Sequence, residues 1–232
     1  MSKWGVSIRT GMSERHVSSW TATACLVVLL PVLEWGAPRV LRATGMAMST
    51  STTWGAIAIA DLMFIALLPV APGRVLRQAW TFPTIKDLGL IVGAFVAGWV
   101  VIPMVQFLAA PLAASLGERT GPSLEPSTGL DVVVLAIASV AGALAQESLY
   151  RGIVWSRVKE LSGNDWVAAA VSSLLFGTLY AGGAMVGFLS AGVAWGLVAG
   201  ILYKVTKSLT CVIVLNAMNV FLTYAVLLRY II

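Results

Sequence analysis

The chain has few charged residues, because aspartate, glutamate, lysine and arginine together make up 11% of its 232 positions while 59% are hydrophobic. Soluble domains carry about 25% charged residues. So little polar surface cannot face water on every side, which excludes a soluble globular protein and predicts an integral membrane protein. The net charge of +5 is explained by the basic residues that orient membrane helices, so we expect no nucleic acid partner.

Histidine and cysteine are also scarce. His16 is the single histidine and lies in the polar N-terminal segment, while Cys25 and Cys211 lie far apart in apolar runs. Two such cysteines predict neither a disulfide framework nor a metal site. The missing histidine ligands exclude a zinc protease. We therefore expect neither a metal nor a cofactor.

Long hydrophobic runs dominate what is present. They cover residues 20–38, 54–72, 88–114, 131–154, 166–182, 184–203 and 208–228, against about 20 residues needed for one membrane crossing. Backbone polar groups in lipid must be satisfied internally, and none of these runs alternates polar and apolar residues as a barrel strand would. The sequence predicts an all-α polytopic membrane protein with about seven transmembrane helices, in which residues 1–232 form a single membrane domain.

Basic residues predict the orientation of these helices, because cytoplasmic loops carry an excess of lysine and arginine. The bases of the N-terminal segment 1–19 and of alternate connections are Lys3, Arg9, Arg15, Arg74, Arg77, Lys86, Arg157, Lys159, Lys204 and Lys207. The loop near 115–130 is more acidic. We expect a multi-pass protein of the bacterial inner membrane with a cytoplasmic N-terminus and an extracytoplasmic C-terminus. Arg39 and Arg42 fall on the opposite side from this rule.

The stretch "GALAQESLYRGIVW" places Glu147 and Arg151 inside a predicted membrane helix. Residues four apart share a helix face and can pair. A charge in hydrocarbon costs several kcal/mol, so such residues commonly mark a functional site. The spacing alone is also satisfied by a structural salt bridge, with Arg151 extending toward the membrane interface.

Three stretches in the back half share the order of a known motif set: "QESLYRG", then "SSLLFGTLY", then "GLVAGILYKVTKSLTCVIVLNAMNVFL". They resemble the CPBP family of CAAX proteases and bacteriocin-processing membrane proteins, also called Abi. Its pattern is E-E-x-x-x-R, F-x-x-x-H and H-x-x-x-N, with G-x-x-x-G-x-x-Y-x-x-T-x-S-L before the last motif. That run is matched by Gly196, Gly200, Tyr203, Thr206, Ser208 and Leu209. The resemblance covers about residues 130–225 and implies a CPBP-like helical core there.

The resemblance also implies the positions of a former catalytic site, which are Gln146, Glu147, Arg151, Phe176, Tyr180, Asn216 and Val220. In active members the first glutamate is thought to activate a water, while two histidines and an asparagine position it and stabilise an oxyanion. Gln146 stands at the first glutamate, Tyr180 and Asn216 at the histidines, and Val220 at the asparagine. A general base must titrate, which a glutamine amide does not do near neutral pH. We expect a degenerate member that is not an enzyme.

Other routes to membrane proteolysis lack a group that they need. Ser190 has no partner histidine, and an aspartyl protease needs two adjacent carboxylates, whereas Asp61 stands alone in its segment. One catalytic alternative remains: Glu147 acts as a replacement base, with Tyr180 and Asn216 donating hydrogen bonds to an oxyanion.

Two further features invite both a functional and a structural interpretation. Asp61 in mid-membrane suggests a proton or ligand site, or a structural acid that faces the later helices or a partner subunit. Glu34 is expected to pair with Arg39.

Gly192, Gly196 and Gly200 form a stripe of small residues on one predicted helix. Such a stripe allows two membrane helices to approach closely.

Together these features predict an accessory or assembly subunit of a larger hetero-oligomeric inner-membrane complex, for which a lipid or cell-envelope transporter is one candidate. A partner helix, a lipid or a peptide would bind the polar residues Glu147, Arg151, Asp61, Tyr180, Asn216 and Asn219. Asp61 and Trp99 are the candidates for external contact. The alternatives are the residual peptidase and a transport protein that uses Asp61 and the Glu147–Arg151 pair, although no internal repeat supports transport.

Overall fold

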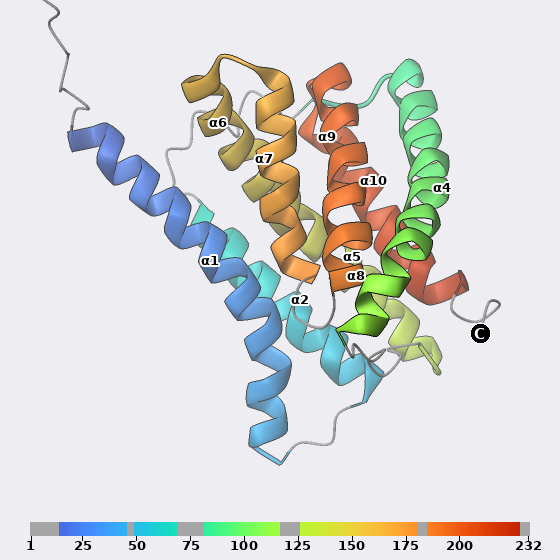
Figure 1. The fold of residues 1–232 in the computed structure, drawn as a ribbon. Coiled ribbons are helices and arrows are strands. Elements are labelled where there is room, and N and C mark those ends of the chain that lie inside the picture. The colour runs from blue at the N-terminus through green and yellow to red at the C-terminus, as the bar shows by residue number, and fades with distance from the viewer. Residues whose placement is uncertain (1–13, 46–48, 69–80, 117–125, 181–184, 228–232) are drawn as a thin grey trace, which may run out of the picture.

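The computed structural model describes residues 14–45, 49–68, 81–116, 126–180 and 185–227, and all regular elements within these ranges are helices. In chain order they are α1 (Glu14–Ala43), α2 (Thr50–Leu67), α4 (Ile85–Ser115), α5 (Gly129–Glu147), η2 (Ser148–Val154), α6 (Trp155–Ser162), α7 (Asp165–Gly177), η3 (Thr178–Tyr180), α8 (Met185–Gly187), η4 (Phe188–Ala194), α9 (Trp195–Thr206), α10 (Leu209–Leu222) and η5 (Thr223–Leu227). The all-α prediction is confirmed (Figure 1).

Each predicted membrane segment corresponds to a helical stretch. The five that are long and apolar enough to cross a membrane are Trp20–Ala43, Thr50–Leu67, Ile85–Ser115, Gly129–Ser162 and Met185–Thr206. The stretches Asp165–Tyr180 and Leu209–Ala225 are apolar but shorter. The predicted boundaries were less accurate than the segments, because α1 continues to Ala43 and α2 begins four residues before the predicted start at 54. The predicted end of this second segment, at 72, lies outside the described residues.

Local sequence signals set where several helices begin. Thr84 and Thr128 each form a capping box with the aspartate three residues later, which satisfies backbone N–H groups at the starts of α4 and α5. Asn164 caps α7 without a capping box, because its side-chain oxygen accepts a hydrogen bond from the Trp166 N–H. Gly163 has a φ of 66° directly before this cap, a left-handed conformation that ends α6.

The helices form a bundle in which α1 and α4 stand on opposite sides of a central group (Figure 1). Within that group α5 packs between α2 and α10, and α7 packs against α6 and α9. The outward face of α4 is apolar, with Val92, Val96, Val100, Met104 and Phe107 all exposed. A long, exposed apolar helix face of this kind suits contact with lipid.

The glycine stripe packs within the chain. A methyl group added at Gly196 would lie 3.1 Å from the Cα of Ser173 on α7, and one at Gly200 would lie 3.6 Å from the Ser173 Oγ. A methyl group at Gly192 would collide with the backbone of Gly177, at the end of α7. The stripe therefore brings η4 and α9 close to α7, as small residues do between membrane helices.

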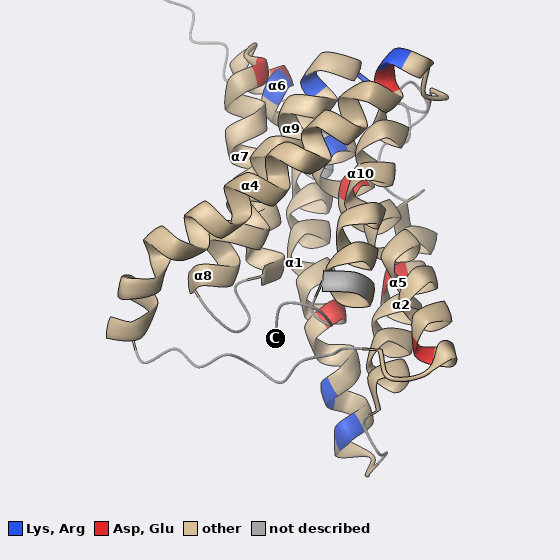
Figure 2. Ribbon diagram, turned by 90° about the vertical axis from the view of Figure 1, so that its right-hand side faces the viewer, with Lys and Arg blue, Asp and Glu red and all other residues tan. Residues whose placement is uncertain are grey.

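Many charged residues lie near the two ends of the bundle, and several lie midway along it (Figure 2). Arg157 and Lys159 lie on α6 and Lys204 in the last turn of α9, at the end where α1 begins. Arg39 and Arg42 lie near the C-terminal end of α1, at the opposite end of the bundle. The orientation of the chain in a membrane, with its two ends on opposite sides, stays a prediction.

Candidate functional site

The pair of charges predicted on one helix face lies where α5 continues into the π-helical turns of η2. Such wide turns often occur at functional sites. Arg151 Nη1 lies 3.1 Å from Glu147 Oε2 and 3.2 Å from its Oε1, and both side chains are 0% exposed. Arg151 Nη2 also donates to the carbonyl oxygen of Gly196 at 2.7 Å. The expectation that Arg151 extends to the membrane interface is wrong, because its guanidinium group is held inside the bundle.

An aromatic shell completes the surroundings of this pair. The Arg151 guanidinium lies 4.5 Å from the ring centroid of Phe176, a favourable cation–π position. Tyr150 meets the same ring edge-on with centroids 5.5 Å apart, and Tyr180 lies 5.5 Å from it at a tilt of 42°. Arg151 thus ties η2 to both α7 and α9, which is what a structural ion pair does.

A chain of hydrogen bonds runs beside the pair and links four helices. Trp195 Nε1 donates to Asn216 Oδ1 at 3.0 Å, and Asn216 Nδ2 donates to Gln146 Oε1 at 3.0 Å. Gln146 Nε2 then donates to Glu34 Oε1 at 3.0 Å. An indole N–H can only donate, so it fixes the orientation of the Asn216 amide and, through it, that of Gln146. The chain therefore ends with Glu34 as a hydrogen-bond acceptor.

This arrangement brings together most of the positions that the CPBP resemblance implies. Glu147, Arg151, Phe176 and Tyr180 form one contact group. Gln146 and Asn216 form the adjoining group through their hydrogen bond, and both are buried. The sequence placed these residues on three separate helices, and the structure places them in one polar centre within an apolar bundle.

The acid pair Glu34 and Asp61 was missed by the sequence reasoning. Asp61 is 0% exposed, and neither of its oxygens accepts a hydrogen bond from a protein donor. A methyl group added at Gly142 would lie 3.2 Å from Asp61 Oδ2 and 3.7 Å from Gln146 Nε2. The Glu34 carboxyl is within hydrogen-bonding reach of the Asp61 carboxyl. Glu34 therefore contacts Gln146 directly, and Asp61 lies nearby.

This geometry corrects three expectations. Glu34 contacts Gln146 and Asp61, while Arg39 donates to the carbonyl oxygen of Trp35 at 2.9 Å. Asp61 has Glu34 as a neighbouring carboxyl group, so the expectation that it lacks the second carboxylate of an aspartyl protease is wrong. Asp61 also cannot be an external contact, because it is fully buried. The sequence signal was available, since Glu34 lies in an apolar segment too and membrane-embedded acids tend to pair with one another.

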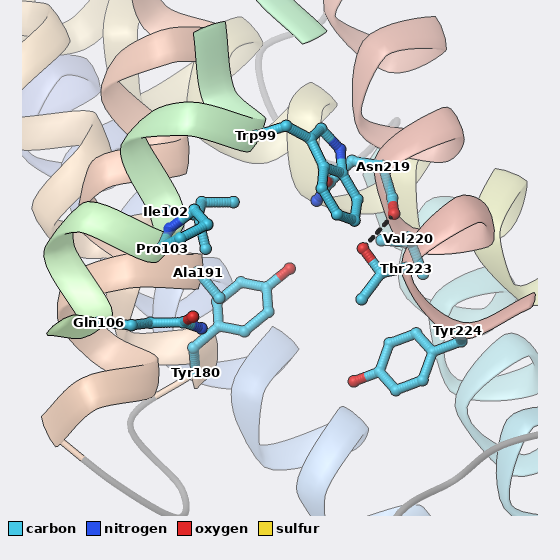
Figure 3. A pocket seen from close by; sticks show the side chains of 10 residues that line it. All are labelled: Trp99, Ile102, Pro103, Gln106, Tyr180, Ala191, Asn219, Val220, Thr223 and Tyr224. Atoms are coloured by element: carbon cyan, nitrogen blue, oxygen red, sulfur yellow. Dashed lines mark hydrogen bonds between the residues drawn. The ribbon is translucent and has the colours of Figure 1, made fainter. Parts of the chain in front are cut away.

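A cavity of about 410 Å³ opens beside the polar centre. Its lining consists of Trp99, Ile102, Pro103, Gln106, Tyr180, Ala191, Asn219, Val220, Thr223 and Tyr224. Tyr180 projects into this space from one side, and Thr223 and Tyr224 from the other (Figure 3). Trp99 Nε1 and Asn219 Oδ1 are buried without a hydrogen-bond partner. Such unsatisfied groups are uncommon and need an explanation, of which an absent bound group is one.

Within the described ranges no three His, Cys, Asp or Glu side chains come together as a group that could hold a metal ion. The absence of a metal and of a cofactor stays a prediction. The groups that could contact a bound molecule are the polar cavity residues Trp99, Gln106, Tyr180, Asn219, Thr223 and Tyr224.

Comparison with known families places this centre in a recognised domain. Residues 128–222 match the family described as type II CAAX prenyl endopeptidase Rce1-like. No curated protein and no solved structure matches the chain. The match includes all elements from α5 to α10, whereas Glu34 and Asp61 lie on helices outside it. The part of this membrane protein from 128 to 222 is therefore an Rce1-like domain of the CPBP family.

Proposed function

We propose that this protein is a non-catalytic Rce1-like membrane protein that serves as an accessory or assembly subunit of a larger complex in a bacterial inner membrane. The hydrogen-bond chain through Gln146 carries the proposal. The amide stands where the CPBP pattern has its first glutamate, and its oxygen and its nitrogen are engaged by Asn216 and Glu34. An amide in such a network cannot take a proton from an attacking water.

A centre of this kind can still recognise a partner, because recognition needs shape and hydrogen-bonding groups rather than a base. The cavity of about 410 Å³ joins the former-site positions Tyr180 and Val220 to Trp99 and Asn219. The unpartnered indole N–H and amide oxygen there offer one donor and one acceptor to a bound group. We infer that a partner helix, a lipid or a peptide occupies this cavity between α4 and α10.

Photo-crosslinking in native membranes tests the proposal. A photoreactive residue at Gln106, which lines the cavity on α4, should capture one specific protein at near-stoichiometric yield. Ile137 is the matched control, because it is 55% exposed on α5 and is not among the residues that line the cavity. If both positions instead give the same scattered set of crosslinked proteins at substoichiometric yield, the subunit proposal is contradicted and transport is favoured. Copurification in mild detergent should recover the same partner.

A second candidate function is peptidase activity with Glu34 as the base. Its carboxylate lies 3.0 Å from Gln146 Nε2, so a carboxylate from outside the Rce1-like domain reaches the position of the family's first glutamate. Glu147 is less suited to this role, since it is fully buried and held by Arg151. Cleavage of a prenylated CAAX peptide that is lost in Glu34→Gln would support this candidate.

A further inference from the structure

We propose that Glu34 and Asp61 form a proton-binding site, in which Asp61 carries a proton and donates a hydrogen bond to Glu34. The site lies between the N-terminal helices and the Rce1-like domain, and neither acid belongs to that domain. It joins α1 and α2 to Gln146 at the end of α5. Its ligand is a single proton, and the two carboxyl groups are the partners that hold it.

The direction of the hydrogen bonds assigns the role of Glu34. Trp195 can only donate, so the amides of Asn216 and Gln146 are each oriented with the oxygen toward the preceding donor. The nitrogen of Gln146 therefore faces Glu34 and supplies a hydrogen. A carboxylate that accepts a hydrogen bond is stabilised in its ionised form. We therefore assign the acceptor role and the negative charge of the pair to Glu34, because its hydrogen bond from Gln146 opposes the effect of burial.

The surroundings of Asp61 assign the proton to it. Asp61 is fully buried, and no protein donor reaches either of its oxygens. Two ionised carboxylates are acceptors only and cannot bond to each other, whereas a protonated carboxyl can donate. An ionised Asp61 would place a second negative charge beside Glu34 without a compensating group. A proton on Asp61 supplies the donor that its contact with Glu34 requires.

The other ionisable groups around the pair do not neutralise it. Tyr150 on η2 and Tyr180 on η3 interact electrostatically with Glu34 and are not cations. Arg151, a cation of the polar centre, is already engaged by Glu147 and by the carbonyl oxygen of Gly196. The negative charge of Glu34 is therefore met by a proton and an amide rather than by a lysine or arginine.

This site gives the N-terminal helices a contact with the Rce1-like domain that depends on protonation. With one proton bound, Asp61, Glu34 and Gln146 form a continuous hydrogen-bonded link across α2, α1 and α5. Loss of the proton would leave two carboxylates facing each other in an apolar bundle, which opposes docking of the hairpin. The proton is therefore a structural ligand of this interface.

Infrared difference spectroscopy on the full-length protein in lipid nanodiscs tests the proposal. A protonated carboxyl gives a C=O stretching band that an ionised carboxylate lacks. We expect this band in the wild type at neutral pH, its loss in Asp61→Asn, and its shift in Glu34→Gln, where the acceptor of the proton changes. Glu160→Gln is the control, because Glu160 is a half-exposed surface acid paired with Arg157, and it should leave the band unchanged.

Three results would overturn the assignment. One is the absence of the band from the wild type, and another is a band that Asp61→Asn leaves intact. The third is a band that emerges only when sodium and potassium are removed, which would show that a metal cation occupies the site. If Asp61→Asn does not accumulate in membranes, the Glu34→Gln spectrum tests the assignment, because an unshifted band excludes Glu34 as the acceptor.

Discussion

Glu147 and Asp61 are both fully buried acids, but the two regions that hold them neutralise them in different ways. Glu147, in the Rce1-like domain, lies 3.1 Å from the fixed cation of Arg151. Asp61, on α2 outside that domain, has no donor among the described side chains unless the Asp61–Glu34 pair itself is protonated. In our proposal, one polar cluster of the bundle is neutralised permanently, while its neighbour depends on an exchangeable proton.

The largest effect is expected from breaking the permanent pair. Glu147→Leu or Arg151→Leu would each leave a buried charge without its partner, which costs about 3–5 kcal/mol. The double replacement should accumulate in membranes better than either single variant, because it leaves no buried charge. Membrane protein levels by quantitative blot measure this. Equal tolerance of the single variants would show that the two side chains are hydrated or unpaired.

A somewhat smaller loss is expected where helix backbones meet. A methyl group at Gly192 would collide with the backbone of Gly177, which cannot move as a flexible side chain would. We expect Gly192→Ala to lower the stability by about 3 kcal/mol, within the upper range for overpacking. Gly93→Ala is the matched control, since no atom lies within 4 Å of its added methyl group. Thermal unfolding in detergent should separate the two, and identical midpoints would contradict this packing.

Trp195→Phe tests the hydrogen-bond chain that lies between the two acid clusters. It would leave the buried Asn216 Oδ1 without its donor and release the orientation of the amides that follow. An unsatisfied buried acceptor costs about 1–2 kcal/mol in stability. The infrared band of the Asp61 carboxyl should shift as well, because Gln146 is then free to turn. A stable variant with an unchanged band would show that these hydrogen bonds do not determine whether Glu34 acts as an acceptor.

The smallest effect is expected for Asp61→Asn. An asparagine has nearly the same shape as a protonated aspartate and can still donate to Glu34, so the stability should change by less than about 1 kcal/mol. Glu147→Gln is the direct comparison, because it leaves Arg151 without its counter-charge and should cost more. Similar losses of thermal stability in the two variants would contradict the distinction between a fixed cation and a bound proton.

Much of the fold could be predicted from composition and motif spacing. The apolar runs gave the helical segments, and the motif order predicted the region 130–225, close to the Rce1-like match at 128–222. The spacing of Glu147 and Arg151 was enough to predict their contact, because a helix fixes which residues share a face. These predictions depend only on local geometry.

Contacts between helices without a motif could not be predicted in the same way. The helix α2 is apolar on nearly all sides, so its periodicity does not show which face carries Asp61 inward. The pairing of Asp61 with Glu34 depends on how α1 crosses α2 beside α5. Trp99 was expected to contact a partner, and the structure shows that it lines the cavity that we propose for one.

The most direct test of the account is a proteolysis assay. Purified full-length protein in lipid nanodiscs is incubated with a prenylated CAAX peptide, products are read by mass spectrometry, and an active Rce1-like enzyme is the positive control. We predict no product from the wild type and none from Gln146→Glu, because Tyr180 and Asn216 would still occupy the histidine positions. Cleavage by the wild type would contradict the account, and its loss in Glu34→Gln or in Glu147→Gln would identify the base.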